Sequence, residues 1–216
     1  MDSLSKQLID IATRYVGVAE TPTGSNRGTQ IDEWNTACGV PVGSYWCASF
    51  VSAMTRKWER ETGHTFPLVT SASCDSWFNQ AKTKGLLTRM ASPGRIMLVM
   101  SATNPNDAIH IGICGYEKDG IISSIEGNSN NDGSNNGTMV ARRTNHASGR
   151  KATNLWYIDW TKGLDLKWDV NVNGKDIDVV TVGDVVYVPI RQIADALDVQ
   201  LDVNSVEKTI RVKNEG

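Results

Sequence analysis

One cysteine of this chain lies where nucleophilic chemistry would place it. Cys47 follows the turn-forming run GSYW, residues 43–46, and comes directly before an apolar pattern of helical spacing. A thiol is a weak nucleophile while it is protonated, and the positive end of a helix dipole stabilises the thiolate. The other interpretation is packing, because buried cysteines in helices are commonly inert. The position of Cys47 indicates a nucleophile but does not exclude a packing role.

A nucleophilic thiol needs a base, and the chain has three histidines. His110 lies inside the apolar strand pattern AIHIGIC, whereas His64 follows a predicted helix end and His146 lies in a polar loop. A base also needs an acceptor that fixes its tautomer. Glu126 ends the next strand pattern, IISSIEGN, and Asn128 follows as a second polar contact. His110 is therefore the candidate base, and a half-buried, hydrogen-bonded histidine is the alternative.

Helical patterns that would position Cys47 dominate the first part of the chain. Apolar residues at helical spacing predict four helices, in residues 4–15, 31–37, 46–62 and 74–84. Asp2 or Ser3 can cap the first helix, and Ser73 can cap the fourth. Gly63 and Gly85 can end the third and the fourth helix.

Strand patterns follow, and they would carry His110 and Glu126. Apolar runs and alternation predict five strands, in residues 96–100, 109–114, 121–126, 138–143 and 154–159. Helices followed by an antiparallel sheet make an α+β domain. The loop 128–137, NSNNDGSNNG, starts like an EF-hand, with Asn128, Asn130, Asp132 and Gly133 at ligand and turn positions. Met139 stands where a bidentate Glu is needed, so we expect no calcium there.

The composition changes after TKGLDLKW, which predicts a second, smaller domain. Residues 1–162 hold 16 Lys and Arg against 14 Asp and Glu, whereas residues 163–216 hold 6 against 10. Apolar runs predict short strands in residues 169–172, 177–180, 185–188, 200–203 and 209–212. Asn173-Gly174 predicts a hairpin turn, and Pro189 opens a predicted short helix.

The bulk composition excludes several classes of protein. The 216 residues carry a net charge of −2, which gives no reason to expect nucleic acid or an anionic membrane as partner. No apolar run approaches the roughly 18 residues of a membrane span. The four cysteines form no CxxC pair, which argues against a zinc ribbon or a thioredoxin-type motif. The first residues lack the pattern of a signal peptide, so we expect a chain made in the cytosol with reduced thiols.

Several separated motifs of the chain resemble the CHAP family, the cysteine- and histidine-dependent amidohydrolases and peptidases with a papain-like α+β fold. The motifs are WCASFV, AIHIGI and IEGN, in this order and spacing, and VGVAETPTGSNRG and SPGRIMLV also fit. The resemblance covers roughly residues 5–160. It implies that Cys47 is the nucleophile, His110 the base, Glu126 the orienting acid and Asn128 an auxiliary asparagine.

The chain departs from the family pattern in two places. Some members carry calcium-binding aspartates just before the nucleophile, but TACGVPVGSYWC has no acid, so we expect no metal and no cofactor. Many relatives have Asp where this chain has Arg95, a change that we expect to alter a turn contact outside the catalytic set. For Cys38, Cys74 and Cys114 we expect packing roles.

The stretch VYVPIRQIADALDVQLDVNSVEKTIRV resembles the small domain named after the N-terminus of copper amine oxidases, which recurs on extracellular bacterial proteins. No histidine follows His146, so this segment lacks the ligand that copper(II) most often uses. Behind a wall-cleaving domain, such a module would raise the local concentration of the enzyme at the wall. The alternative is an appendage that stabilises or oligomerises the chain.

Together the resemblances imply a peptidoglycan hydrolase, most like a phage or prophage endolysin that waits in the host cytoplasm for a holin pore. The bond remains open between the N-acetylmuramoyl-L-alanine amide and an endopeptidase site in the stem or cross-bridge. The alternatives are a host autolysin or secretion-associated wall peptidase, a non-catalytic cell-wall-binding protein, and a hydrolase of a non-wall amide. The sequence leaves the oligomeric state open.

Overall fold

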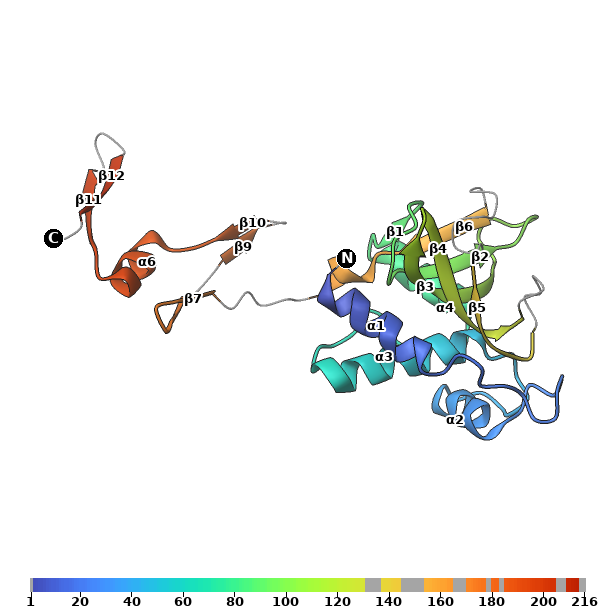
Figure 1. Cartoon of the computed structure of the whole chain (residues 1–216). Coiled ribbons are helices and arrows are strands. Elements are labelled where there is room, and N and C mark those ends of the chain that lie inside the picture. Colours follow the sequence, from blue (N-terminus) through green and yellow to red (C-terminus); the bar gives the residue numbers. More distant parts are fainter. Residues whose placement is uncertain are drawn as a thin grey trace. The chain divides into compact units, whose positions relative to one another are not determined.

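The computed structural model describes residues 2–130, 137–144, 154–164, 170–177, 180–182, 185–204 and 209–213 (Figure 1). The chain divides into two compact units, Met1–Leu164 and Asp165–Gly216. The boundary expected from composition, between residues 162 and 163, lies two residues before this division. Within the described residues, no helix is long and apolar enough to span a membrane.

The first unit opens with the helices that the sequence predicts. They are α1 (Ser3–Thr13), α2 (Thr29–Ala37), α3 (Cys47–Thr62) and α4 (Cys74–Thr83). Asp2 caps α1 by accepting from the Ser5 amide at 2.7 Å, and Ser73 caps α4 by accepting from the Ser76 amide at 3.2 Å. Gly63 ends α3 with φ of 74°, a conformation that favours glycine. The four predicted helices are confirmed.

The strands of the first unit form one antiparallel sheet in the order β1-β6-β2-β3-β4-β5. They are β1 (Leu87–Thr88), β2 (Ile96–Met100), β3 (Ala108–Lys118), β4 (Ile121–Ser129), β5 (Met139–Arg143) and β6 (Leu155–Ile158). The five predicted strands and the α+β class are confirmed. Strand β1 was not predicted, because a strand of two residues is too short to show an alternation of apolar and polar residues.

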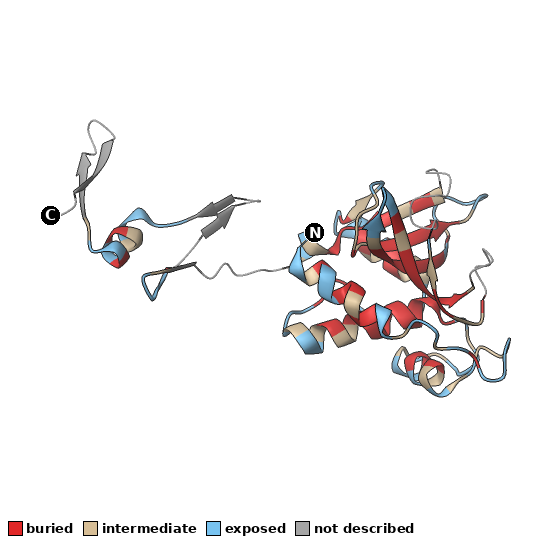
Figure 2. Ribbon diagram, viewed as in Figure 1, coloured by how far each residue is buried: buried red, intermediate tan, exposed pale blue. Residues whose placement is uncertain are grey.

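Both faces of the sheet are buried, as the red strands in Figure 2 show. One face packs with the helices in the main core, through Ile96, Leu98, Met100, Ile111, Ile113 and Ile125. The other face holds a smaller apolar cluster made of Met97, Val99, Cys114, Ile122, Leu155 and Tyr157. Helix α3 contacts β3 and β4, and α4 contacts β3. The first turns of these helices lie beside the strands that carry His110 and Glu126. Asp75 of α4 accepts from the Ala108 amide of β3 at 2.7 Å, and a Cβ atom added at Gly127 of β4 would lie 2.5 Å from Phe50 Cβ of α3.

A short 3-10 helix, η2 (Trp160–Gly163), closes the core of the first unit. The Trp160 ring is fully buried, with its centroid 5.0 Å from Trp58 and 4.9 Å from Phe66. Its indole nitrogen donates to the carbonyl of Gly94 at 2.7 Å. The core of the first unit therefore extends to within a few residues of the division between the units.

Arg95, for which the sequence predicts an altered turn contact, directly precedes β2. Its guanidinium pairs with Asp159 at 2.6 Å and donates to the carbonyl of Met90 at 2.7 Å. Arg95 therefore ties the start of β2 to the residue that follows β6.

The described residues of the second unit form three antiparallel strand pairs and one helix. Its elements are β7 (Val170–Val172), β8 (Lys175–Ile177), β9 (Val180–Val182), β10 (Val185–Tyr187), α6 (Ile190–Leu197), β11 (Gln200–Asn204) and β12 (Thr209–Lys213). Asn173 and Gly174 have positive φ values of 51° and 79°, as the predicted hairpin turn requires. Of the strand predicted over 177–180, Ile177 pairs in β8 and Val180 pairs in β9, and the two positions between them lie outside the described residues.

Candidate active site

Cys47 is the first residue of α3, and the residue before it is firmly anchored. The Trp46 side chain is fully buried, and its indole nitrogen donates to Glu20 at 3.0 Å. Cys47 itself is only 8% exposed. The first amides of a helix have no acceptor within the helix. In α3 these free N–H groups lie at the end that begins with Cys47. The sequence therefore folds so that a buried sulfur faces the positive end of a helix.

A second cysteine lies beside the first. The sulfur of Cys74, the first residue of α4, is 3.7 Å from the sulfur of Cys47. The Ser52 hydroxyl donates to the carbonyl of Ser71 at 2.8 Å and accepts from the Ser71 amide at 2.9 Å. This pair fixes α3 to the segment that leads into α4. Cys74 packs against the main core as expected, but its contact with Cys47 was missed.

His110 and Glu126 form a fully buried pair on neighbouring strands. His110 Nε2 lies 2.8 Å from Glu126 Oε2. The antiparallel register that pairs Ile113 with Ile125 brings Glu126 next to Gly112. A Cβ atom added at Gly112 would lie only 2.6 Å from Glu126 Cγ. The glycine in AIHIGIC therefore leaves the space through which the Glu126 side chain reaches His110.

Three further side chains hold the Glu126 carboxylate. Ser124 donates to Oε1, Ser129 donates to Oε2 at 3.3 Å, and Arg143 Nη1 lies 3.3 Å from Oε2. A buried carboxylate is costly unless such donors replace its hydration. The same donors fix its position, so the rotation of the His110 ring is fixed as well.

The electrostatics of Cys47 and His110 favour a thiolate beside an imidazolium. The hydrogen bond with Cys74 and then the interaction with His110 lower the pKa of Cys47 well below its usual value, against the opposing effect of burial. Burial disfavours the charged form of His110, but Cys47 and then Glu126 outweigh it and raise the pKa of His110 to about 9. The lowered pKa makes the thiolate of Cys47 available at lower pH than that of an ordinary cysteine, as a nucleophile requires.

Asn128, the fourth predicted site residue, is buried at the end of β4. Its φ is 51°, and its carbonyl accepts from the Gly137 amide at 2.8 Å. Its side-chain oxygen has no hydrogen-bond partner among the residues that the structure describes. The structure thus brings Cys47, His110 and Glu126 together and gives Asn128 a backbone role.

Several residues around the site were missed by the sequence analysis. They are Glu20, Cys74, Ser124, Ser129 and Arg143. Ser124 had a readable signal, because it stands two residues before Glu126 and so shares its strand face. Ser129 also lies in β4, but the register against β5 shifts between Glu126 and Ser129, so the simple alternation does not find it. Glu20, Cys74 and Arg143 reach the site from other parts of the chain, and a spacing rule along one element does not find them.

The remaining cysteines and histidines lie in other surroundings. Cys114 is fully buried in the second cluster, where burial raises its pKa to about 12, so the expected packing role is confirmed. Cys38 caps the end of α2. His64 stacks on Trp58 with ring centroids 5.9 Å apart, and His146 lies outside the described residues.

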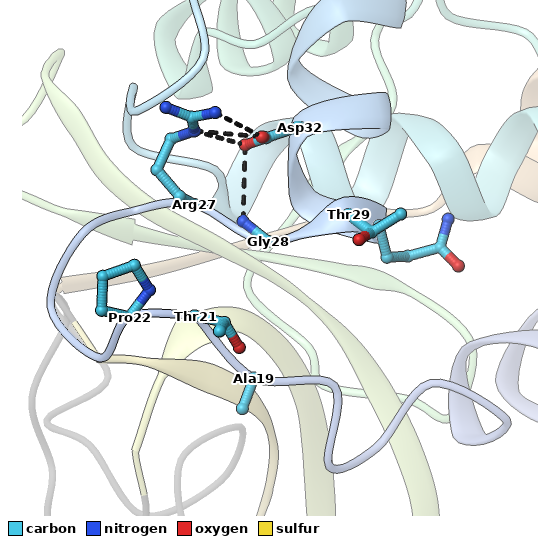
Figure 3. Close-up of a pocket in the computed structure, with 8 residues that line it drawn as sticks. Ala19, Thr21, Pro22, Arg27, Gly28, Thr29 and Asp32 are labelled. Carbon is cyan, nitrogen blue, oxygen red and sulfur yellow. Dashed lines mark hydrogen bonds and ion pairs between the residues drawn. The ribbon is translucent and has the colours of Figure 1, made fainter.

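An open cavity of about 640 Å³ lies on the segment VGVAETPTGSNRG (Figure 3). Its lining comprises Ala19, Thr21, Pro22, Arg27, Gly28, Thr29, Gln30 and Asp32. The Arg27 guanidinium pairs with Asp32 at 2.9 Å, as Figure 3 shows from one side. Glu20 lies between two lining residues and binds Trp46. The cavity wall is thereby connected to the residue that precedes Cys47.

In the described part of the chain, no three His, Cys, Asp or Glu side chains gather as a metal ion would require. Of the loop that begins like an EF-hand, Asp132 and Gly133 lie outside the described residues. Comparisons with protein-family models, with curated proteins and with solved structures found no match.

Proposed function

We propose that this chain is a CHAP-like cysteine hydrolase with a papain-like first unit, and that it cleaves an amide bond in the peptide of bacterial peptidoglycan. The observation that carries the reaction type is the buried Cys47–His110–Glu126 set at the start of α3. The choice of substrate is supported by the motif resemblance, since papain-like folds accept many amides.

The reaction would begin from the thiolate–imidazolium pair. The Cys47 thiolate attacks the amide carbonyl, and the first-turn amides of α3 stabilise the oxyanion. His110 then donates its proton to the leaving amine, which leaves a thioester on Cys47. His110, now neutral, takes a proton from water, and the resulting attack releases the acid and restores the thiolate.

Glu126 would act as a positioning residue in this scheme. It binds His110 Nε2, and His110 also interacts with Cys47, which raises the pKa of the imidazole. In this scheme Nδ1 would therefore serve the nucleophile. The donors from Ser124, Ser129 and Arg143 keep its carboxylate in place while His110 gains and loses its proton.

The cavity on residues 19–32 is the candidate subsite for part of the wall peptide. Its lining is polar, with hydroxyls, an amide and the Arg27–Asp32 pair available to peptide groups. We leave open whether the cleaved bond is the muramoyl-L-alanine amide or a peptide bond of the stem or cross-bridge. The proposed setting is a phage endolysin acting on the host wall after holin release, with a host autolysin as the second candidate.

The decisive experiment is digestion of purified peptidoglycan by the full chain, by Cys47→Ala and by the matched control Cys38→Ala. Mass spectrometry of the released fragments then identifies the new amino terminus and the length of the peptide. We expect release by the parent and by Cys38→Ala only. If none of the three releases fragments from several wall chemotypes, the hydrolase proposal fails, and wall binding without catalysis becomes the better candidate.

For the second unit we propose wall targeting. Residues 163–216 carry 6 Lys and Arg against 10 Asp and Glu, which argues against simple attraction to anionic teichoic acids. Binding would therefore be to peptidoglycan itself. The test compares sedimentation of Cys47→Ala full chain and Cys47→Ala residues 1–164 with purified sacculi. Equal sedimentation of the two would contradict the targeting role.

A further inference from the structure

Two thiols meet at the candidate active site, although the reaction scheme needs only one. The Cys47 and Cys74 sulfurs are 3.7 Å apart, and both residues are unpaired cysteines. They are 27 positions apart in the sequence and begin two different helices, α3 and α4. The Ser52–Ser71 hydrogen bonds hold these helix starts together. The contact is therefore built by the fold rather than by proximity along the chain.

We propose that Cys47 and Cys74 form a reversible disulfide when the protein meets a peroxide, and that this modification switches the nucleophile off. The sulfurs need to approach from 3.7 Å to about 2.05 Å, a movement that side-chain rotation at two adjacent helix starts can supply. The blocking effect rests on the proposed function, whereas formation of the bond does not.

The chemistry balances with a peroxide as the oxidant. The Cys47 thiolate attacks one oxygen of hydrogen peroxide, the O–O bond breaks, and hydroxide leaves and is protonated to water. Cys47 is then a sulfenic acid. The Cys74 sulfur attacks the Cys47 sulfur, the S–O bond breaks, and the departing hydroxide takes the Cys74 proton to form a second water. Two thiols are oxidised by two electrons in total, and one peroxide is reduced.

The surroundings assign different roles to the two sulfurs. Contact with Cys74, then with His110 and the Ala48 amide, lowers the pKa of Cys47 and makes it the thiolate that meets the oxidant first. The Cys47 contact and then burial raise the pKa of Cys74 well above its usual value, so Cys74 stays protonated and does not meet the oxidant first. Once Cys47 is a neutral sulfenic acid, the negative charge that raises the pKa of Cys74 is gone, and Cys74 can act as the resolving thiol. Cys114 lies in the other cluster and cannot compete.

A disulfide would protect the nucleophile as well as block it. A sulfenic acid without a resolving partner proceeds to sulfinic acid, which thiol reductants do not restore. An activated Cys47 thiolate that meets peroxide before the protein reaches its substrate would be over-oxidised in this way. With Cys74 at 3.7 Å, the first oxidation product is captured in a form that dithiothreitol reduces.

The test uses the reduced full chain, its excess reductant removed, and a several-fold excess of hydrogen peroxide. Peptide mapping by mass spectrometry without reduction is expected to find the peptides of Cys47 and Cys74 joined, with two hydrogens lost. Cleavage of peptidoglycan is expected to fall in parallel and to return with dithiothreitol. Sulfinic acid at Cys47 in the parent, with no joined peptide, would overturn the proposal.

Two variants complete the design. Each variant is compared with itself before oxidation, after oxidation and after reduction. In Cys74→Ser, the fraction of the starting activity that dithiothreitol restores is expected to be about tenfold lower than in the parent. The reason is that Cys47 is oxidised to sulfinic acid, which dithiothreitol does not reduce. Cys38→Ser, the matched control, is expected to behave like the parent, and equal recovery in all three proteins would contradict the switch. If the joined peptide forms but no form of the chain cleaves peptidoglycan, the disulfide stands and the proposed function fails.

Discussion

The acid–base state of two residues governs the proposed chemistry. The active form has a Cys47 thiolate and a protonated His110. Because the pKa of His110 is raised to about 9, the proton for the leaving amine is present at neutral pH and is lost only as the pH rises through that value. Because the pKa of Cys47 is lowered, its thiolate persists to lower pH than that of an ordinary cysteine, and it is lost as the pH falls through the lowered value.

The first prediction is therefore a bell-shaped dependence of kcat/KM on pH, with its basic limb near pH 9. The measurement is the initial rate on a soluble muropeptide across the pH range. A basic limb near 6.5, the ordinary value for histidine, would show that Cys47 and Glu126 do not support the imidazolium.

The second prediction concerns the coupling of the two groups and needs no substrate. In Cys47→Ala the largest contribution that raises the pKa of His110 is removed, so this pKa is expected to fall below its value of about 9. NMR titration of labelled histidine measures it directly. The matched control is Cys38→Ala, whose His110 should titrate as in the parent. An unchanged His110 pKa in Cys47→Ala would show that Cys47 does not influence the titration of His110.

The third prediction tests the carboxylate. Glu126→Gln keeps the shape of the side chain but leaves Arg143 facing a neutral amide and His110 without its charged acceptor. We expect kcat/KM to fall by about 10²- to 10⁴-fold and the free energy of unfolding to fall by about 3–5 kcal/mol. Exposed Glu117 on the same sheet provides the control, as Glu117→Gln should alter neither quantity. Full activity in Glu126→Gln would show that the Glu126 carboxylate does not contribute to the reaction.

At the scale of elements, local signals were sufficient for most helices and strands. Single residues mark three of the helix ends: Asp2 and Ser73 cap α1 and α4, and Gly63 ends α3. Such ends can be predicted from the sequence alone. The contact of Cys74 with Cys47 depends on how two helices lie on one sheet. That arrangement is fixed by packing, and it has no signature at either cysteine.

The candidate site shows the same division between local and tertiary information. His110 stood out as a polar residue in an apolar strand, and Glu126 as the end of the next strand, so antiparallel pairing was sufficient to join them. Arg143 arrives from β5, whose place beside β4 follows from the sheet order. The space beside Gly112 could not be predicted from the sequence either, because it depends on the register of β3 against β4.

The fourth prediction follows from that space. In Gly112→Ala the new methyl group would overlap Glu126 Cγ, so Glu126 must move away from His110. We expect a loss of activity of at least about tenfold, with an unfolding cost of about 1–3 kcal/mol. Gly115→Ala is a matched control, because its Cβ would meet Ser123 instead of Glu126. It should lose comparable stability while it keeps its activity, and equal inactivation of both variants would contradict a specific role for Gly112.

At the scale of the whole molecule, the two units differ in how they are built. The first unit has a continuous buried core that runs from α1 to η2, and Trp160 belongs to it. In the second unit, the described part offers short hairpins and one amphipathic helix, whose Ile190 and Leu197 are exposed. Two-stranded hairpins alone are marginally stable in water. The first unit is therefore the part of the chain that should fold without help.

The fifth prediction is that residues 1–164 unfold cooperatively on their own and cleave a soluble muropeptide with the kcat of the full chain. The reason is that the site and its supporting core lie within this unit. The cut must follow η2, because Trp160 packs on Trp58 and Phe66 and binds Gly94. In the same fragment, Trp160→Ala is expected to lower the free energy of unfolding by about 3–5 kcal/mol, as measured by chemical denaturation. A fragment 1–164 that fails to fold, while the full chain folds, would show that the second unit contributes to the stability of the first.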